Sequence, residues 1–245
     1  MSGHSKWHNI QATKGKRDAA RSKIFTKIGR ELAVAVKAGG PDPASNPTLR
    51  AVIAKAKQNN MPNDNIDRSI KKAAGENGGV NYESIVYEGY GVGGSAVIVE
   101  CLTDNKNRTA GDVRHAFDKH GGALGSNGCV SYLFQRKGII IVPREEGLDS
   151  DALLMDALEA SAKDGIEHDD EVEIITATNE VNPGKEELEK LGYNIVMSQS
   201  SLVPDMYVDL DEAKLATFQK MISVLEELDD VQEVYHNVNL PEDEE

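Results

Sequence analysis

Residues 83–120, ESIVYEGYGVGGSAVIVECLTDNKNRTAGDVRHAFDKH, contain the change of pattern that decides the fold. The β-branched and aromatic side chains of Glu83–Gly89 and Ser95–Leu102 predict two strands. Thr109 and Asp112 have the spacing of a capping box, which predicts that a helix opens there. Two strands followed directly by a helix indicate a layered domain that contains both kinds of element.

The chain beyond this stretch repeats the mixture of strands and helices. Residues 121–128, GGALGSNG, predict a helix cap and a turn, because they follow a helix and contain no Gly-Lys-Ser/Thr. Further strands are expected at 129–134, 138–142, 171–177, 193–198 and 231–236, and helices at 151–163, at 185–191 and along 215–225. The order shows no regular alternation of strand and helix, so the fold class is predicted to be α+β.

The chain before this stretch is helical and basic. A first helix is expected over residues 18–37, with these apolar residues on one arc: Ile24, Phe25, Ile28, Leu32 and Val36. The opposite arc, expected to face solvent, holds Lys23, Lys27, Arg30 and Lys37. Asn46 before Pro47 predicts the start of a second helix. A third opens at Asn63, with the basic residues Arg68, Lys71 and Lys72. Residues 2–16 are expected to form a flexible arm.

Charge is distributed unevenly along the chain. Its net charge is −14, yet residues 1–75 hold fifteen Lys/Arg and five Asp/Glu, a net of +10. The remaining residues hold twelve basic and thirty-six acidic side chains, a net of −24. A basic region attached to an acidic body predicts oriented binding to a polyanion such as nucleic acid.

The candidate nucleic-acid-binding residues follow from this asymmetry. Phosphate contacts are predicted for Lys6, Lys14, Lys16, Arg17, Arg21, Lys23, Lys27 and Arg30. Trp7 could stack on a base or anchor the arm to the helices. A second cluster at a helix start comprises Lys106, Arg108, Arg114 and Lys119, which could bind phosphate or pair with nearby carboxylates.

Other classes of function have little support in the sequence. No catalytic motif is present, so an enzyme is not expected. Residues 167–171 lack the spacing of a calcium loop, and Cu²⁺ or Ni²⁺ at Ser2-Gly3-His4 would be adventitious, so no metal or other cofactor and no small-molecule substrate is predicted. No apolar run is long enough to span a membrane and no secretion signal opens the chain, so a cytoplasmic location is expected.

Four stretches carry a resemblance to a known family. They are GHSKWHNIQATKGKRDAARSKIFTKIGREL, NPTLRAVIAKAKQNNMPNDNIDRSIKKA, YEGYGVGGSAVIVECLTDNKNRTAGDVRHAF and KHGGALGSNGCVSYLF, and together they cover residues 3–134 almost without a break. The chain closely resembles the YebC family over this length. Its C-terminal part is similar in length and pattern but less distinctive.

The resemblance implies three domains, a helical one followed by two α+β domains of which one is inserted into the other. On this chain they would be 1–80, then 81–135 with 205–240, and the acidic insertion 136–204. Bacterial members are described as probable DNA-binding transcriptional regulators. Other members act in translation, and bacterial members are also linked to relief of ribosome stalling at proline runs. This implies RNA or the ribosome as the alternative partner. A third hypothesis, from the charge alone, is an acidic protein-interaction scaffold.

Overall fold

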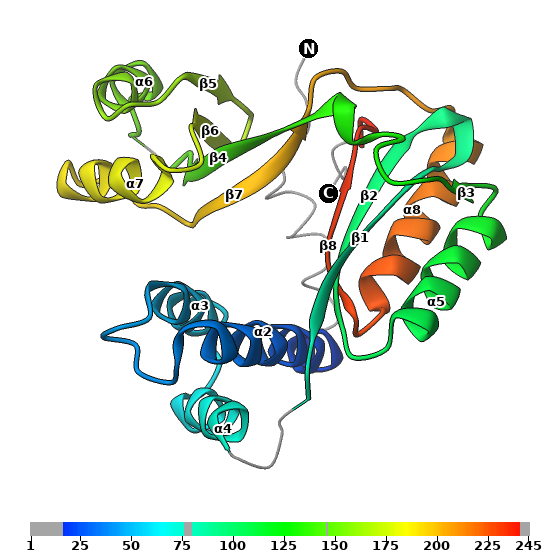
Figure 1. The fold of residues 1–245 in the computed structure, drawn as a ribbon. Helices are drawn as coiled ribbons and strands as arrows, with labels where there is room; N and C mark the ends of the chain where they lie inside the picture. The colour runs from blue at the N-terminus through cyan, green and yellow to red at the C-terminus, as the bar shows by residue number, and fades with distance from the viewer. Residues whose placement is uncertain (1–16, 76–79, 146, 241–245) are drawn as a thin grey trace. The chain divides into compact units, whose positions relative to one another are not determined.

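The computed structural model describes residues 17–75, 80–145 and 147–240, with side chains from residue 22 onward (Figure 1). These residues form seven α-helices and two four-stranded sheets, which confirms the predicted α+β class. They divide into two compact units, described separately below. The first comprises the described parts of 17–131 with 210–236, and the second comprises 132–209 with 237–240. The division into three domains stays a prediction.

Three helices begin the first unit: α2 (Arg17–Gly39), α3 (Pro47–Gln58) and α4 (Asn63–Ala74). Their shared core is apolar and includes Ile28, Leu32, Val36, Leu49 and Ile66. The Asn46 side chain accepts a hydrogen bond from the Leu49 N–H at 3.0 Å, so the predicted cap of α3 is confirmed. The prediction is wrong for Ile24, whose side chain is exposed because it lies at one end of the apolar arc, although the adjacent Phe25 packs against the core.

A four-stranded sheet follows in the same unit. Its order is β3 (Ala123–Leu124), β1 (Glu83–Tyr90), β2 (Ala96–Thr103), β8 (Val231–His236), and every pairing is antiparallel. Helices α5 (Lys106–Lys119) and α8 (Glu212–Glu227) lie side by side against one face (Figure 1). Gly93, with a φ of 72°, makes the tight β1–β2 turn; a Cβ there would lie 2.5 Å from Leu210 Cδ2.

Two predictions near this sheet are wrong. Helix α5 begins at Lys106 instead of Thr109, because the Asn105 side chain accepts from the Arg108 N–H and caps it three residues earlier. Residues 129–133 of the strand expected at 129–134 do not form one; a short 3₁₀ turn, Ser131–Leu133, precedes the next strand, which begins at Phe134. Their backbone N–H groups are bonded to a side chain, as described below.

The second unit has the sheet order β5 (Asp164–Glu167), β6 (Glu171–Thr176), β4 (Phe134–Pro143), β7 (Met197–Pro204). Helices α6 (Ser150–Glu159) and α7 (Val181–Lys190) pack on one face, where Ile140, Val142 and Leu153 are buried. Strand β4 is longer than expected because residues 134–137 pair with β7 before the pairing with β6 begins at Gly138. Strand β7 starts four residues later than the strand expected from residue 193, and β3 and β5 were not predicted.

Candidate nucleic-acid interface

The basic face of α2 contacts the end of another helix. Lys23 Nζ donates to the carbonyl oxygen of Glu227 at 3.2 Å, and Lys27 Nζ donates to that of Glu226 at 3.1 Å. The last carbonyls of a helix have no intrahelical donor and carry partial negative charge, so cations are favoured there. Burial lowers the pKa of Lys27, although the Glu226 carboxylate acts in the opposite direction. Lys23 and Lys27 therefore cap α8.

The third cation of this face is largely buried in a polar network. Arg30 forms an ion pair with Asp230 and donates to the Leu102 carbonyl at 2.8 Å, and its guanidinium lies 5.3 Å from the centre of the Tyr82 ring. Its side chain is only 12% exposed. The prediction that this arc faces solvent is wrong for Arg30, and Lys23 and Lys27 are half-buried. Whether any of the three contacts phosphate stays a prediction.

Asp230 is the centre of that network. Its carboxylate, 7% exposed, also accepts from Arg108 Nη2 at 2.8 Å, Thr109 Oγ1 at 2.7 Å and Thr103 Oγ1 at 3.1 Å. Burial by itself would raise the pKa of Asp230, but the hydrogen bonds from Thr109, Arg108 and Arg30 outweigh it and hold the pKa at about 2. The network joins α2, α5 and the start of β8.

The second predicted cluster is largely paired within the protein. Lys106 forms an ion pair with Glu83, and Arg108 Nη2 lies 2.7 Å from Asp104 Oδ1 in addition to its contacts with Asp230. Arg114 and Lys119 are exposed and form no ion pair with any part of the chain that the structure describes. Of this cluster, these two cations are the ones that remain available to an external anion.

Helix α4 carries a row of exposed cations. Arg68, Lys71 and Lys72, called here the α4 cations, are exposed, and no ion pair joins them to another described residue. They are three and four positions apart, which places them on one side of the helix. The opposite side carries Ile66 and Ile70 into the core. In the sequence these cations resemble the basic stripe on α2, so the charge pattern alone does not single them out.

The remaining candidates lie at the N-terminal end. Lys6, Trp7, Lys14 and Lys16 lie outside the described residues, as do the expected arm and the Ser2-Gly3-His4 group. Arg17 and Arg21 belong to the first turns of α2, but their side chains are outside the described set.

The glycine-rich segment after α5 holds one of the protein's own carboxylates. Glu88, buried on β1, accepts hydrogen bonds from the backbone N–H groups of Gly128 at 2.9 Å, Val130 at 3.0 Å and Ser131 at 2.8 Å. Burial would raise the pKa of Glu88, but these three hydrogen bonds lower it. Because the carboxylate occupies these donors, they are not available to a phosphate. The same bonds explain why residues 129–131 do not pair as a strand.

Two kinds of reactive centre, a metal-binding cluster and an activated thiol, are not found in the described residues. They contain no group of three or more His, Cys, Asp or Glu side chains placed to hold a metal ion. Burial raises the pKa of the Cys101 thiol to about 12 and also raises that of Cys129, so neither is a ready nucleophile at neutral pH. No described helix has the length and apolar character that a membrane crossing requires.

The fold and charge together define an α+β protein with a cationic helical region and an acidic remainder. Residues 5–76 match the model of the TACO1/YebC protein N-terminal domain, and residues 82–238 match that of the TACO1/YebC second and third domain. The chain belongs to the TACO1/YebC family, which confirms the resemblance found in the sequence.

Similar proteins match this chain over nearly its whole length. A probable transcriptional regulatory protein of Hathewaya histolytica is 58% identical over 243 residues, covering 99% of this chain and 98% of the relative. One from Clostridium botulinum (strain Okra / Type B1) has the same identity and coverage. The crystal structure of a conserved hypothetical protein from Aquifex aeolicus is 48% identical with a TM-score of 0.85, covering 98% of each chain. The names of these curated relatives support a regulatory, non-enzymatic role.

Proposed function

We propose that this protein is a non-enzymatic regulator that binds nucleic-acid phosphates through its N-terminal helical region, acting in the cytoplasm as a DNA-binding regulator of transcription. The observation that carries the proposal is the exposed row of α4 cations, which form no ion pair with another described residue, in a region of net positive charge. Cations that displace condensed counterions from nucleic acid bind it without reading its sequence. The printed names of the relatives support transcription as the process.

The phosphate-binding surface includes more than the α4 cations. Arg114 is a second exposed contributor, and the cations of residues 6–21 extend the basic region along the chain. Lys23, Lys27 and Arg30 contribute to the positive potential, but direct phosphate contact would compete with their present bonds to α8 and Asp230. We therefore assign them a supporting role.

Changing Arg68, Lys71 and Lys72 together to alanine is expected to weaken binding to duplex DNA of every sequence tested. If each cation contacts one phosphate, the slope of log affinity against log salt becomes shallower by about 2 to 3, since each contact contributes roughly 0.7 to 0.9. Fluorescence anisotropy between low and moderate salt measures this slope. The melting temperature should stay the same, because these side chains are exposed and form no ion pair within the part of the chain that the structure describes.

A matched control removes three cations from the acidic unit. The triple change Lys163→Ala, Lys185→Ala and Lys190→Ala alters the net charge by the same amount and should leave the slope unchanged. If both triple variants lose affinity equally, net charge alone determines binding and the α4 assignment is wrong.

A ribosome-associated role in translation is the alternative, and an acidic scaffold is the second. The acidic unit supports the ribosomal alternative, because a ribosome offers basic protein as well as RNA, whereas duplex DNA presents only negative charge. Crosslinking in cells followed by sequencing of bound DNA and RNA separates the candidates. Promoter DNA supports transcription, ribosomal RNA supports translation, and neither would be enriched for a scaffold.

A further inference from the structure

Helix α6 exposes apolar side chains on its outer face. Leu153 and Ala157 are buried against the sheet, but Met155 is 64% exposed and Leu158 is 55% exposed. The two exposed residues are three positions apart, so they lie together on one side of the helix. A helix that packs on a sheet with one face normally shows polar residues on the other. This outer face, Met155 with Leu158, departs from that pattern.

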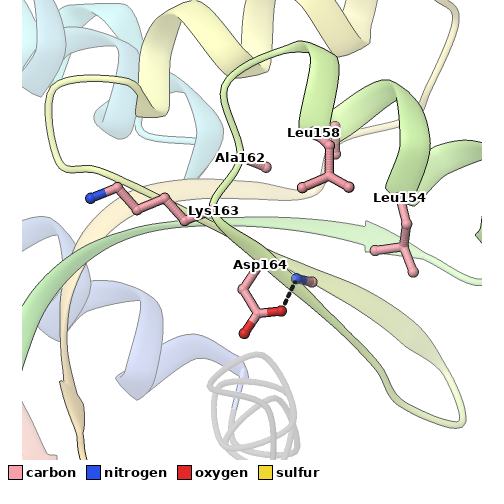
Figure 2. A pocket seen from close by; sticks show the side chains of 7 residues that line it. Leu154, Leu158, Ala162, Lys163 and Asp164 are labelled. Atoms are coloured by element: carbon pink, nitrogen blue, oxygen red, sulfur yellow. Dashed lines mark hydrogen bonds between the residues drawn. The ribbon is translucent and has the colours of Figure 1, made fainter.

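A cleft opens beside this face. It has a volume of about 190 Å³ and is lined on its apolar side by Leu154, Ala157, Leu158 and Ala162 (Figure 2). Gly165 on β5 forms part of the wall, and a Cβ there would lie 2.2 Å from Leu154 Cδ2. The absence of a side chain at Gly165 therefore lets Leu154 lie over the strand. The volume of the cleft is comparable to that of one large apolar side chain.

The charged groups at the cleft are placed at its margin. Figure 2 shows Lys163 extending away from Leu154 and Leu158. The Asp164 carboxylate accepts from the Gly165 N–H at 2.9 Å. The floor is thus apolar while the edge carries charge, the usual arrangement of a protein-binding surface.

The surroundings of the cleft are strongly acidic. Residues 132–209 contain six Lys/Arg and eighteen Asp/Glu, a net charge of −12. Asp151 and Glu159 are exposed on α6 itself, on either side of Met155 along the helix. A field of this sign repels nucleic acid and attracts a cationic partner.

We infer that the outer face of α6 and the adjoining cleft bind a basic amphipathic segment of another protein. An apolar side chain of that segment enters the cleft beside Leu158, and its Lys or Arg residues lie near Asp151 and Glu159. Apolar burial supplies the affinity, and charge supplies the orientation and the rate of encounter. A second copy of this chain fits poorly if it presents the same face, because two surfaces of net −12 would meet.

The test uses the full-length protein and two synthetic peptides that differ only in apolar content. One is an amphipathic helix with leucines on one face and lysines on the other, and the second has every leucine replaced by serine. We expect the leucine peptide to bind more tightly. Changing Met155→Ser and Leu158→Ser should weaken its binding by about tenfold or more, as measured by fluorescence anisotropy.

Two control variants make the test specific. Met206→Ser alters another exposed methionine of the same unit and should leave the affinity unchanged. Asp151→Asn with Glu159→Gln should weaken binding and make it less dependent on salt. The proposal is overturned if both peptides bind equally, if the leucine peptide does not bind, or if the Met155 and Leu158 changes have no effect. It is also overturned if those changes abolish self-association in light scattering, which would identify the face as a contact between copies.

Discussion

Replacing Asp230 with alanine is expected to destabilise the first unit by about 3–5 kcal/mol, because the change leaves a buried cation without its partner. Arg30 is 12% exposed and would keep the Leu102 carbonyl but lose its carboxylate. The hydroxyls of Thr103 and Thr109 would lose an acceptor at the same time. Urea unfolding followed by circular dichroism measures the free energy of unfolding.

The natural control for this prediction is Asp104, which also pairs with Arg108. Its side chain is 41% exposed and the pair spans one helical turn, so Asp104→Ala should cost well under 1 kcal/mol. If Asp230→Ala costs as little as Asp104→Ala, the network around Asp230 contributes little to stability.

Acid should remove the stability that the Asp230 carboxylate contributes. The folded-state pKa of Asp230, about 2, lies below the ordinary value of 3.8. A depressed carboxyl pKa contributes stability that is complete above the unfolded value and is lost as pH falls from about 4 towards 2. The Asp230→Ala variant should therefore lose less stability over this range than the unmodified protein.

Replacing Glu171 with glutamine is expected to stabilise the second unit at alkaline pH. Glu171 is buried on β6, and neither carboxylate oxygen has a hydrogen-bond donor among the described residues. Burial, followed by the nearby Asp170 carboxylate, raises the pKa of Glu171 to about 8. The folded state then binds a proton that the unfolded state releases near pH 4.5, so stability falls as pH rises between these values. Above pH 8 the substitution should add about 2–3 kcal/mol.

His168, close to Glu171 in the sequence, also makes the stability of the second unit depend on pH. His168 Nε2 lies 3.4 Å from Glu173 Oε2, and this contact raises the pKa of His168. The stability that protonated His168 contributes is complete below pH 6.5 and is lost at higher pH. The stability of the unit therefore falls with rising pH through His168 as it does through Glu171. Glu171→Gln should therefore make the fall in stability with rising pH less steep without removing it. Asp169 is an exposed neighbour, and Asp169→Asn should leave this fall unchanged. A parallel decline in all three proteins would rule out titration of Glu171.

The sequence could predict elements that depend on nearby residues. The helix starting after Asn46 and the strand at 231–236 follow from local caps and apolar spacing, and both are confirmed. Local signals failed at Thr109, whose hydroxyl bonds to Asp230 instead of capping a helix. They also failed at residues 129–133, where Glu88 takes backbone donors that a strand would use.

The site was harder to predict because charge patterns do not reveal partners distant in sequence. Arg30 and Asp230 are two hundred positions apart, and no periodicity relates them. Lys27 and Arg68 are equally basic in the sequence, yet one caps a distant helix and the other is exposed. Composition correctly identified a cationic region, whereas the availability of each cation depends on the tertiary fold.

The position of β8 in the first sheet affects how the protein is made. Strand β2 pairs on one side with β1, which precedes it directly, and on the other side with β8, where Cys101 meets Val231. The three N-terminal helices can pack together during synthesis as soon as residue 75 has emerged, since their contacts are local. The sheet must wait until residues 231–236 leave the ribosome. Until then β2 is an apolar edge strand with unpaired backbone groups, which is the form most prone to aggregation. Chains that stop before residue 231 should consequently be insoluble even though nine-tenths of the sequence is present.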